Sequence, residues 1–248
     1  MGRRLGQHFL VRESILEKIA AAVCGEHTAT VVEIGPGKGA LTRRLLDRSD
    51  RVVAIEVDPY LVGYLRQRFH DHHRLTIVES DVLKTDLGQW GTAAVAGNLP
   101  YYITSPIVSH LFSTPGWQQA VFLVQKEVAE RMTATPGSRD YGYLTVQVSL
   151  NSHAELLFPV SRAAFAPPPK VESAVLRLTP RESGITDRAA FLAFASLAFG
   201  QKRKTLRNNL RAMYPAIDGM PEAGLRAEQV GLEDLVRLYQ RLSGQAPG

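Results

Sequence analysis

A glycine-rich turn joins a short apolar run to a helical pattern near the start of the chain. The run covers residues 30–34, the turn is Gly-Pro-Gly-Lys-Gly at 35–39, and the helical pattern covers 40–47. Glycines in such a turn let the backbone approach a ligand at the carboxyl edge of a parallel sheet. A P-loop requires Ser or Thr directly after the lysine, and the dinucleotide-binding fingerprint requires glycine where Ala40 stands. The turn therefore predicts a ligand-binding α/β fold outside these two classes.

The alternation of apolar runs and helical patterns continues over the first 150 residues. Strands are predicted at 30–34, 51–56, 75–79, 93–97 and 120–124, and helices at 40–47, 59–69, 126–132 and from Ser105 onward. This spacing is typical of βαβ units in a parallel sheet that is buried on both faces. Two later runs, at 154–159 and 171–178, are joined by a short proline-rich loop, which predicts an antiparallel pair at one sheet edge.

The pattern changes near residue 180. The stretch 179–187 is polar and contains Pro and Gly, as linkers do, and helical patterns follow at 189–199, 201–212 and 233–242. We predict a Rossmann-like catalytic domain over 1–180 and a small helical domain over 187–248.

Glycines or polar residues stand at the ends of the first four predicted strands. Gly35 and Gly37 follow the first strand, Glu56 ends the second 21 residues after Gly35, and Asp81 and Asn98 end the next two. Glu56 can accept both ribose hydroxyls of an adenosine moiety, and Asp81 can accept from an adenine amino group. Alternatively, both acids are helix N-caps or turn formers. The ordered set at one sheet edge favours a nucleoside-containing cofactor.

The segment Asn98-Leu99-Pro100-Tyr101 suits methylation of an exocyclic amino group. The N6 atom of adenine is a poor nucleophile because its lone pair is delocalised into the ring. The Asn98 side-chain oxygen and a backbone carbonyl of Leu99 or Pro100 can hold the two N6 hydrogens. Catalysis then consists mainly of positioning and desolvation.

An enzyme that acts on a base must take it out of its stack, so an aromatic pocket is expected. Tyr101 is placed to stack on one face of the base. Phe165, in the proline-rich stretch 164–170, is a candidate for the other face. On its own, Phe165 is equally well explained as a core or loop side chain.

Motifs along almost the whole chain resemble those of the ribosomal RNA adenine dimethyltransferases, and within them the small-subunit branch. They are GQHFL at 6–10, EIGPGKGALT at 33–42, AIEVDPYL at 54–61, SDVL at 80–83, GNLPYYITSPI at 97–107, QKEVAERMTATPGSRDYGYLTV at 125–146, FAPPPKVESAVLRL at 165–178 and KRKTLRNNL at 202–210. The chain carries His8 and Tyr102 at two positions where Asn is frequent in the family.

The resemblance implies the class I methyltransferase fold, with S-adenosylmethionine as cofactor and S-adenosylhomocysteine as product. It implies cofactor contacts at His8, Leu10, Gly35, Glu56, Asp81 and Asn98. It places the target-base pocket at Asn98, Leu99, Pro100, Tyr101 and Phe165. It also implies N6-dimethylation of two adjacent adenosines in the 3′-terminal hairpin of small-subunit (16S) rRNA, in an immature subunit late in assembly.

Three other functions compete with this interpretation. A sister branch methylates large-subunit rRNA and confers macrolide resistance, but it usually has Ile where this chain has Leu99. A second alternative is a binding protein that serves mainly as a ribosome-assembly factor, against which the intact cofactor and target-base residues argue. DNA N6-adenine methyltransferases usually begin the corresponding motif with Asp, where this chain has Asn98.

Basic residues are concentrated late in the chain. The net charge is +5, and the stretch 199–211 holds five basic residues and no acid. We expect a basic amphipathic helix there to contact rRNA phosphates, which supply affinity rather than base choice. The predicted contacts are Lys202, Arg203, Lys204 and Arg207. The alternative is a solvated charged face.

The remaining composition predicts neither metal nor membrane. Cys24 is the single cysteine, which excludes a disulfide framework and a cysteine-based zinc site. His70, His72 and His73 lie in a charged loop and are interpreted as solvated surface rather than metal ligands. No apolar run reaches the roughly 20 residues of a membrane span, and no signal peptide is recognised. We expect a cytoplasmic monomer.

Overall fold

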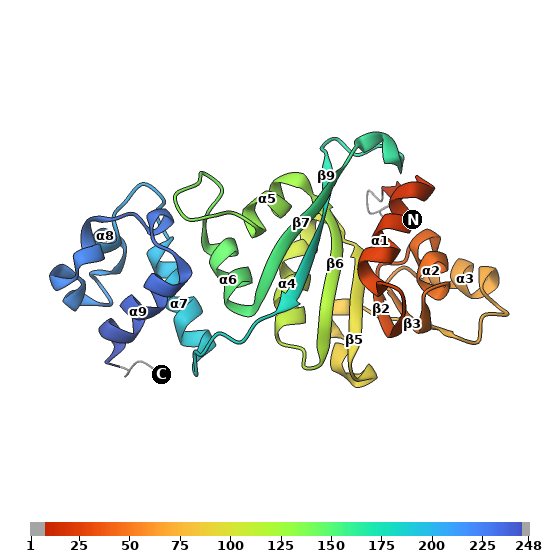
Figure 1. The fold of residues 1–248 in the computed structure, drawn as a ribbon, viewed down its shortest axis with the longest axis horizontal. Coiled ribbons are helices and arrows are strands. Elements are labelled where there is room, and N and C mark those ends of the chain that lie inside the picture. The colour runs from red at the N-terminus through yellow and green to blue at the C-terminus, as the bar shows by residue number, and fades with distance from the viewer. Residues whose placement is uncertain (1–7, 245–248) are drawn as a thin grey trace. The chain divides into compact units, whose positions relative to one another are not determined.

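A computed structural model describes residues 8–244, and Gly6 and Gln7 of the GQHFL motif lie outside that range. Its centre is a seven-stranded sheet (Figure 1). In spatial order the strands are β4 (Leu75–Glu79), β3 (Ser49–Glu56), β2 (Thr28–Ile34), β5 (Ala93–Asn98), β6 (Trp117–Gln125), β9 (Ser173–Pro180) and β7 (Ser152–Val160). The first five are parallel, which confirms the predicted α/β class.

The two late strands occupy one edge of the sheet, as predicted. β9 pairs antiparallel with β6, and β7 lies outside it. The antiparallel direction brings the first residue of β9, Ser173, opposite Gln125 at the carboxyl end of β6. A small second sheet pairs β1 (Phe9–Leu10) with β8 (Phe165–Ala166).

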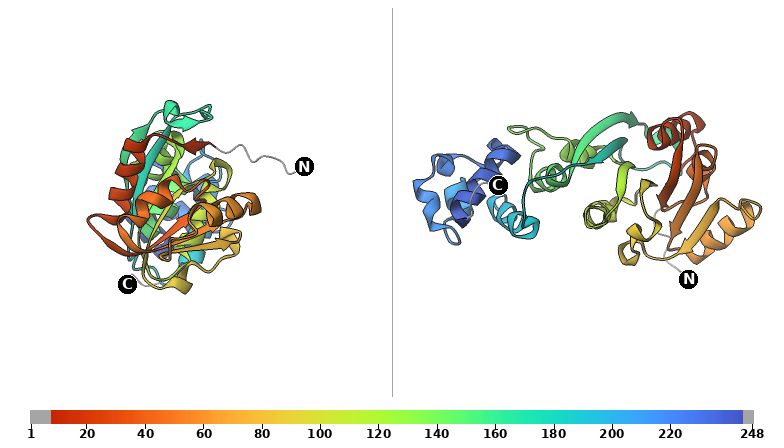
Figure 2. Two further views of the ribbon diagram at one scale, coloured as in Figure 1. Left: turned by 90° about the vertical axis from the view of Figure 1, so that its right-hand side faces the viewer. Right: turned by 60° about the horizontal axis from the view of Figure 1, so that its bottom comes forward.

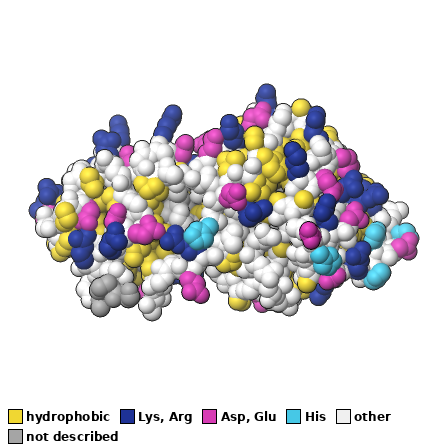
Figure 3. Space-filling model, viewed as in Figure 1, with side chains coloured by type: hydrophobic (Ala, Val, Ile, Leu, Met, Phe, Trp, Pro, Cys, Tyr) yellow, Lys and Arg dark blue, Asp and Glu magenta, His cyan; other side chains and the backbone are white. Residues whose placement is uncertain are grey.

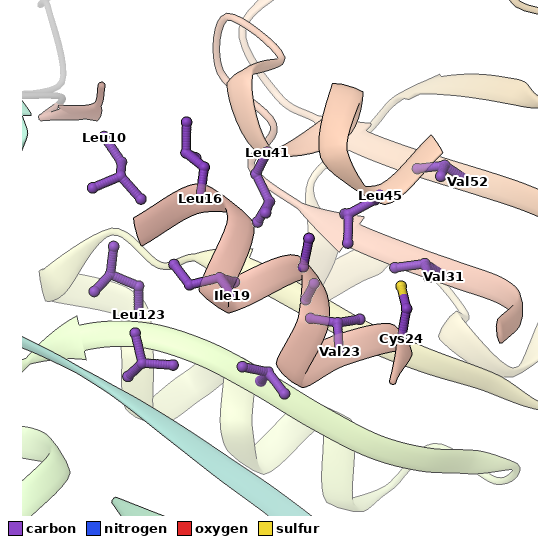
Figure 4. Close-up of a cluster of buried hydrophobic side chains, with 14 of the residues drawn as sticks. Leu10, Leu16, Ile19, Val23, Cys24, Val31, Leu41, Leu45, Val52 and Leu123 are labelled. Carbon is purple, nitrogen blue, oxygen red and sulfur yellow. The ribbon is translucent and has the colours of Figure 1, made fainter. Parts of the chain in front are cut away.

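Helices α1 (Glu13–Cys24) and α2 (Ala40–Leu46) pack against each other and on the sheet. Figure 4 shows Leu16, Ile19 and Val23 of α1 directed toward side chains of α2 and of the strands. Cys24 is 3% exposed at the end of α1, where it packs as a small buried side chain. Burial raises its pKa to about 11.

The other helices of this part connect successive strands. α3 (Pro59–Arg68) follows β3 and is capped by Asp58, whose Oδ1 accepts from the N–H of Tyr60 at 2.9 Å. α4 (Thr104–Phe112) connects β5 to β6, and α5 (Lys126–Met132) follows β6. Short 3₁₀ helices cover Val82–Lys84, Leu87–Trp90, Tyr101–Ile103 and Arg162–Ala164.

The chain divides into two compact units. The first comprises 1–129 and 155–180, and the second comprises 130–154 and 181–248. The segment 130–154, which we expected in the catalytic domain, therefore groups with the C-terminal helices. The boundary at 180/181 coincides with the start of the predicted linker region.

The second unit has its own hydrophobic core. Its helices are α6 (Tyr143–Asn151), α7 (Arg188–Ala198), α8 (Leu206–Leu210) and α9 (Leu232–Ser243), with 3₁₀ turns at Pro215–Gly219, Pro221–Gly224 and Ala227–Gln229 (Figure 2). Phe191 and Phe194 of α7 pack with Tyr239 of α9, and α6 adds Val146 and Leu150. Thus α6 supplements a core that about 60 residues alone would supply poorly.

The helix predicted over 201–212 is wrong in its first part. Residues 201–204 form a turn, Thr205 caps the N-terminus, and α8 extends only from Leu206 to Leu210. Between residues 8 and 244, none of the helices has the length and apolar character needed to cross a bilayer.

Candidate active site

A cavity of about 550 Å³ opens at the carboxyl ends of the parallel strands. The N-terminal segment, the glycine-rich turn and the turn after β5 supply its walls. All seven predicted cofactor residues line it, namely His8, Leu10, Gly35, Gly37, Glu56, Asp81 and Asn98. Leu99, Pro100 and Tyr101 line it as well, so the structure brings ten of the predicted residues together.

The glycine-rich turn is built from left-handed backbone that favours glycine. Gly37 has φ 57°, and a Cβ there would lie 3.0 Å from the ring of Phe9. Gly39 has φ 75°, and its Cβ would lie 2.5 Å from Phe69. Lys38 between them lies 5.1 Å from the centre of the Phe9 ring. Sequence analysis missed this contact, through which Phe9 holds the N-terminal segment against the turn.

Glu56 is tied to the turn through its carboxylate. The Gly37 N–H donates to Oε2 at 3.2 Å, and the N–H groups of Val57 and Asp58 donate to Oε1 at 2.9 and 3.0 Å. Burial raises the pKa of Glu56, and these three hydrogen bonds oppose the rise. A carboxylate has about four acceptor positions, so Oε2 retains capacity for a ligand hydroxyl.

Asp81 caps a 3₁₀ turn and also lies in the cavity wall. Its Oδ1 accepts from the Leu83 N–H at 3.0 Å and caps the 3₁₀ turn at Val82–Lys84. The residue also lines the cavity. One carboxylate oxygen fixes the local backbone, and the second remains for a donor in the cavity.

Glu33 is a cavity residue to which sequence analysis assigned no role. It is 2% exposed near the end of β2, and its Oε2 accepts from Thr42 Oγ1 at 2.6 Å. Burial raises its pKa to about 7, the Thr42 hydrogen bond opposes the rise, and the charge of Glu56 adds to it. The sequence feature that could have identified Glu33 is an acidic residue inside an otherwise apolar predicted strand.

Asn98 is oriented by the N-terminal segment. Its Nδ2 donates to the backbone carbonyl of His8 at 3.1 Å. With the nitrogen engaged there, the amide presents Oδ1 as its free acceptor. The His8 ring has two further contacts, Nδ1 to the Pro167 carbonyl at 2.8 Å and a near-parallel arrangement with Tyr101 at 6.3 Å between ring centres.

The turn after Asn98 distinguishes between the two predicted carbonyl acceptors. The Pro100 carbonyl already accepts from the Ile103 N–H at 3.1 Å and from Thr104 Oγ1 at 3.2 Å. The Leu99 N–H donates to the Leu123 carbonyl at 3.0 Å, which continues the sheet register into the turn. Of the two, the Leu99 carbonyl is therefore the better placed to accept from a ligand.

Phe165 is not among the residues that line the cavity. It is 3% exposed in β8, where it pairs with Leu10, and it belongs to the hydrophobic core cluster. The burial fits the alternative of a core side chain, and the role as a second wall of the base pocket stays a prediction.

The basic residues predicted to contact RNA belong to the second unit. Lys202, Arg203 and Lys204 are exposed in the turn before α8, and we call these three residues the basic turn. Lys202 Nζ donates to the carbonyl of Arg139, so this turn is attached to the loop before α6. The face in Figure 3 shows Lys and Arg interspersed with acidic side chains, so positive charge does not dominate it.

Arg207 differs from the basic turn because it has an acidic partner. Its Nε lies 3.2 Å from the carboxylate of Asp218, which also pairs with Arg211 at 3.1 Å. The basic stretch 199–211 contains no acid, but Asp218 from outside it partly neutralises its charge in the folded protein. Among residues 8–244, no group of three His, Cys, Asp or Glu side chains is arranged to hold a metal ion.

Comparisons with known proteins show the family to which the chain belongs. Residues 2–235 match the family model described as ribosomal RNA adenine dimethylase. The chain is 44% identical to ribosomal RNA small subunit methyltransferase A of Acidobacterium capsulatum, over 98% of this chain and 92% of that protein. It is 42% identical to the protein of the same name from Thiobacillus denitrificans, over 94% of each chain.

Solved structures agree as well. A dimethyladenosine transferase from Plasmodium falciparum superposes with a TM-score of 0.84 at 27% identity, over 97% of this chain and all of that one. The 23S rRNA methyltransferase ErmE superposes with a TM-score of 0.75 at 31% identity, over 95% of this chain and 99% of that one. The predicted class I methyltransferase fold is confirmed, and the chain belongs to the ribosomal RNA adenine dimethylase family.

Proposed function

We propose that this chain transfers methyl groups from S-adenosylmethionine to N6 of two adjacent adenosines in the 3′-terminal hairpin of small-subunit rRNA. The observation that carries the proposal is the orientation of Asn98, whose amide oxygen is left free at the cavity by the bond from Nδ2 to His8. Relatives named small subunit methyltransferase A, at 42–44% identity, support the choice of subunit.

The cavity fits this cofactor in size and chemistry. Its volume of about 550 Å³ lies within the range of small-molecule sites. Glu56 holds the ribose hydroxyls, Asp81 accepts from the adenine amino group, and the glycine-rich turn lets the backbone approach. Leu10 and His8 close the cavity from the N-terminal segment. The bound cofactor supplies an electrophilic methyl group.

The residues after β5 orient the target nitrogen. Asn98 Oδ1 and the Leu99 carbonyl accept the two N6 hydrogens, which turns the nitrogen lone pair toward the methyl donor. N6 becomes acidic once methylated, so a strong general base is not required. Removal of one such charge-stabilising contact typically lowers kcat by about 100- to 1,000-fold.

The second unit supplies affinity for the rRNA. Lys202, Arg203 and Lys204 form an exposed cluster that suits phosphate contacts, whereas Arg207 is partly neutralised by Asp218. Adenine itself is too common to specify one site, so recognition of a folded particle is required. We place the reaction on an immature small subunit late in assembly, carried out by a monomer in the cytoplasm.

The test uses purified protein, labelled S-adenosylmethionine, and unmethylated small subunits or large-subunit rRNA. We expect dimethyladenosine in the small-subunit sample and its loss in Asn98→Ala, with cofactor binding measured separately by calorimetry. Gln67→Ala, an exposed substitution on α3 outside the cavity, serves as the control.

Two other outcomes would redirect the assignment. Label in large-subunit rRNA alone would place the chain with the 23S rRNA methyltransferases, to which it is 31% identical in one solved case. Tight subunit binding without transfer to either substrate would favour an assembly factor.

A further inference from the structure

The hydroxyl of Tyr101 is held by a residue far away in the sequence. Its oxygen lies 2.9 Å from Oγ of Ser173, and the two side chains share a hydrogen bond across 72 positions of the chain. Tyr101 lines the cavity, whereas Ser173 is not among the lining residues. A functional role for Ser173 therefore has to act through the tyrosine.

Ser173 is a rigid anchor. It is fully buried as the first residue of β9, and it is paired with Gln125 of β6. The antiparallel direction of β9 brings this first residue to the edge where the parallel strands end. The hydroxyl therefore has a position fixed by the central sheet.

The Tyr101 ring is consequently held at both ends. The backbone is fixed by Pro100, whose carbonyl accepts from Ile103 and Thr104, and the phenol oxygen is fixed by Ser173. A tyrosine attached only through its backbone samples several side-chain rotamers. A flipped base stacks on an aromatic ring only when the ring face is presented to it.

We propose that Ser173 is a positioning residue, whose hydroxyl holds the face of the Tyr101 ring toward the cavity before the target base arrives. Ordering the ring in advance removes an entropic cost from base docking and helps to set the geometry for methyl transfer. This proposal rests on the proposed function, since it names the base as the group that stacks on Tyr101.

The first test observes the ring directly and needs no substrate. In protein with ¹³C-labelled tyrosine, the Tyr101 ring resonances are identified by their absence in Tyr101→Phe. We expect Ser173→Ala to shift or broaden them. Ser49→Ala is the matched control, because Ser49 is also buried at the start of a strand and donates to the Leu45 carbonyl at 2.8 Å, away from the cavity. Tyr101 resonances unchanged in Ser173→Ala overturn the proposal.

The second test is a kinetic double-mutant cycle on unmethylated small subunits. Tyr101→Phe and Ser173→Ala should each lower kcat about three- to tenfold, as loss of one hydrogen bond predicts, and the double variant should be no worse than either. The Kd for S-adenosylmethionine should not change, and Ser173→Thr, which keeps the hydroxyl, should restore kcat.

The results separate the two proposals. Two results contradict the positioning role. One is a double variant in which the two reductions of kcat multiply. The other is a normal kcat for Ser173→Ala when Tyr101→Phe is impaired. Absence of transfer by the unmodified protein contradicts the proposed function instead, and the NMR comparison still decides whether Ser173 orients the ring.

Discussion

Replacing Glu33 by Gln should remove a pH dependence from the stability of the first unit. Glu33 is 2% exposed, and its contact with Thr42 Oγ1 at 2.6 Å can be kept by the amide oxygen of Gln. Burial raises the pKa of this carboxyl from 4.5 to about 7. The substitution is nearly isosteric, so the two proteins differ chiefly in one titrating proton.

The sign follows from the two ionisation states. Between pH 4.5 and 7, folded protein keeps the Glu33 proton that unfolded protein has lost, so the free energy of unfolding falls as pH rises through this window. At about 1.4 kcal/mol for each tenfold change in the ionisation constant, the whole effect is about 3 kcal/mol. Between pH 5 and 8, wild-type protein should lose about 2 to 3 kcal/mol relative to Glu33→Gln.

Urea unfolding followed by tryptophan fluorescence measures this difference. The two tryptophans, Trp90 and Trp117, lie in the first unit and report its unfolding. Glu26→Gln, an exposed substitution after α1, controls for the loss of a carboxyl as such. A stability difference between wild type and Glu33→Gln that stays constant from pH 5 to 8 would refute the reasoning.

Three other substitutions test separate parts of the molecule. Gly39→Ala should lower the free energy of unfolding by about 2 kcal/mol or more in urea titration, because the added Cβ would lie 2.5 Å from the ring of Phe69. Gly63→Ala is the control: Gly63 lies in α3 with open space around it, so this substitution should be neutral or stabilising. Asp81→Asn keeps a capping oxygen but turns an amide donor toward the adenine amino group, so calorimetry should show about tenfold weaker cofactor binding. Lys204→Ala, which removes one exposed charge of the basic turn, should flatten the salt dependence of subunit binding more than Arg207→Ala, and equal slopes would contradict the charge assignment.

Much of the catalytic fold could be predicted because its signals are local. Alternating apolar runs and helical patterns located the five parallel strands, and strand ends in a parallel sheet necessarily meet at one edge. For that reason Glu56, Asp81 and Asn98 were found together without any knowledge of contacts.

Helix α6 was missed because its sequence lacks an amphipathic pattern. Its nine residues, Tyr143–Asn151, include β-branched side chains and are mostly buried. A helix surrounded by other elements does not show the polar face on which the period of 3.6 depends.

Other differences depend on contacts between distant residues. The salt bridge from Arg207 to Asp218, the burial of Phe165 against Leu10, and the bond from Tyr101 to Ser173 all join separate segments. No periodicity in a single sequence encodes such pairs. The shorter α8 has a local cause that was overlooked, since Thr205 is a favourable N-cap inside the predicted helix.

The carbonyl that orients Asn98 belongs to the main chain of His8. A saturation-mutagenesis library of the N-terminal segment, selected for methyl transfer, would show what this means for each position. Any L-residue at position 8 supplies the same carbonyl, so the orientation of Asn98 should tolerate side-chain diversity there. Proline at Val11 should be selected against, because the Val11 N–H donates to the Ala164 carbonyl at 2.9 Å next to the pairing of β1 with β8. At position 11, selection should therefore follow the backbone hydrogen bond more closely than side-chain chemistry.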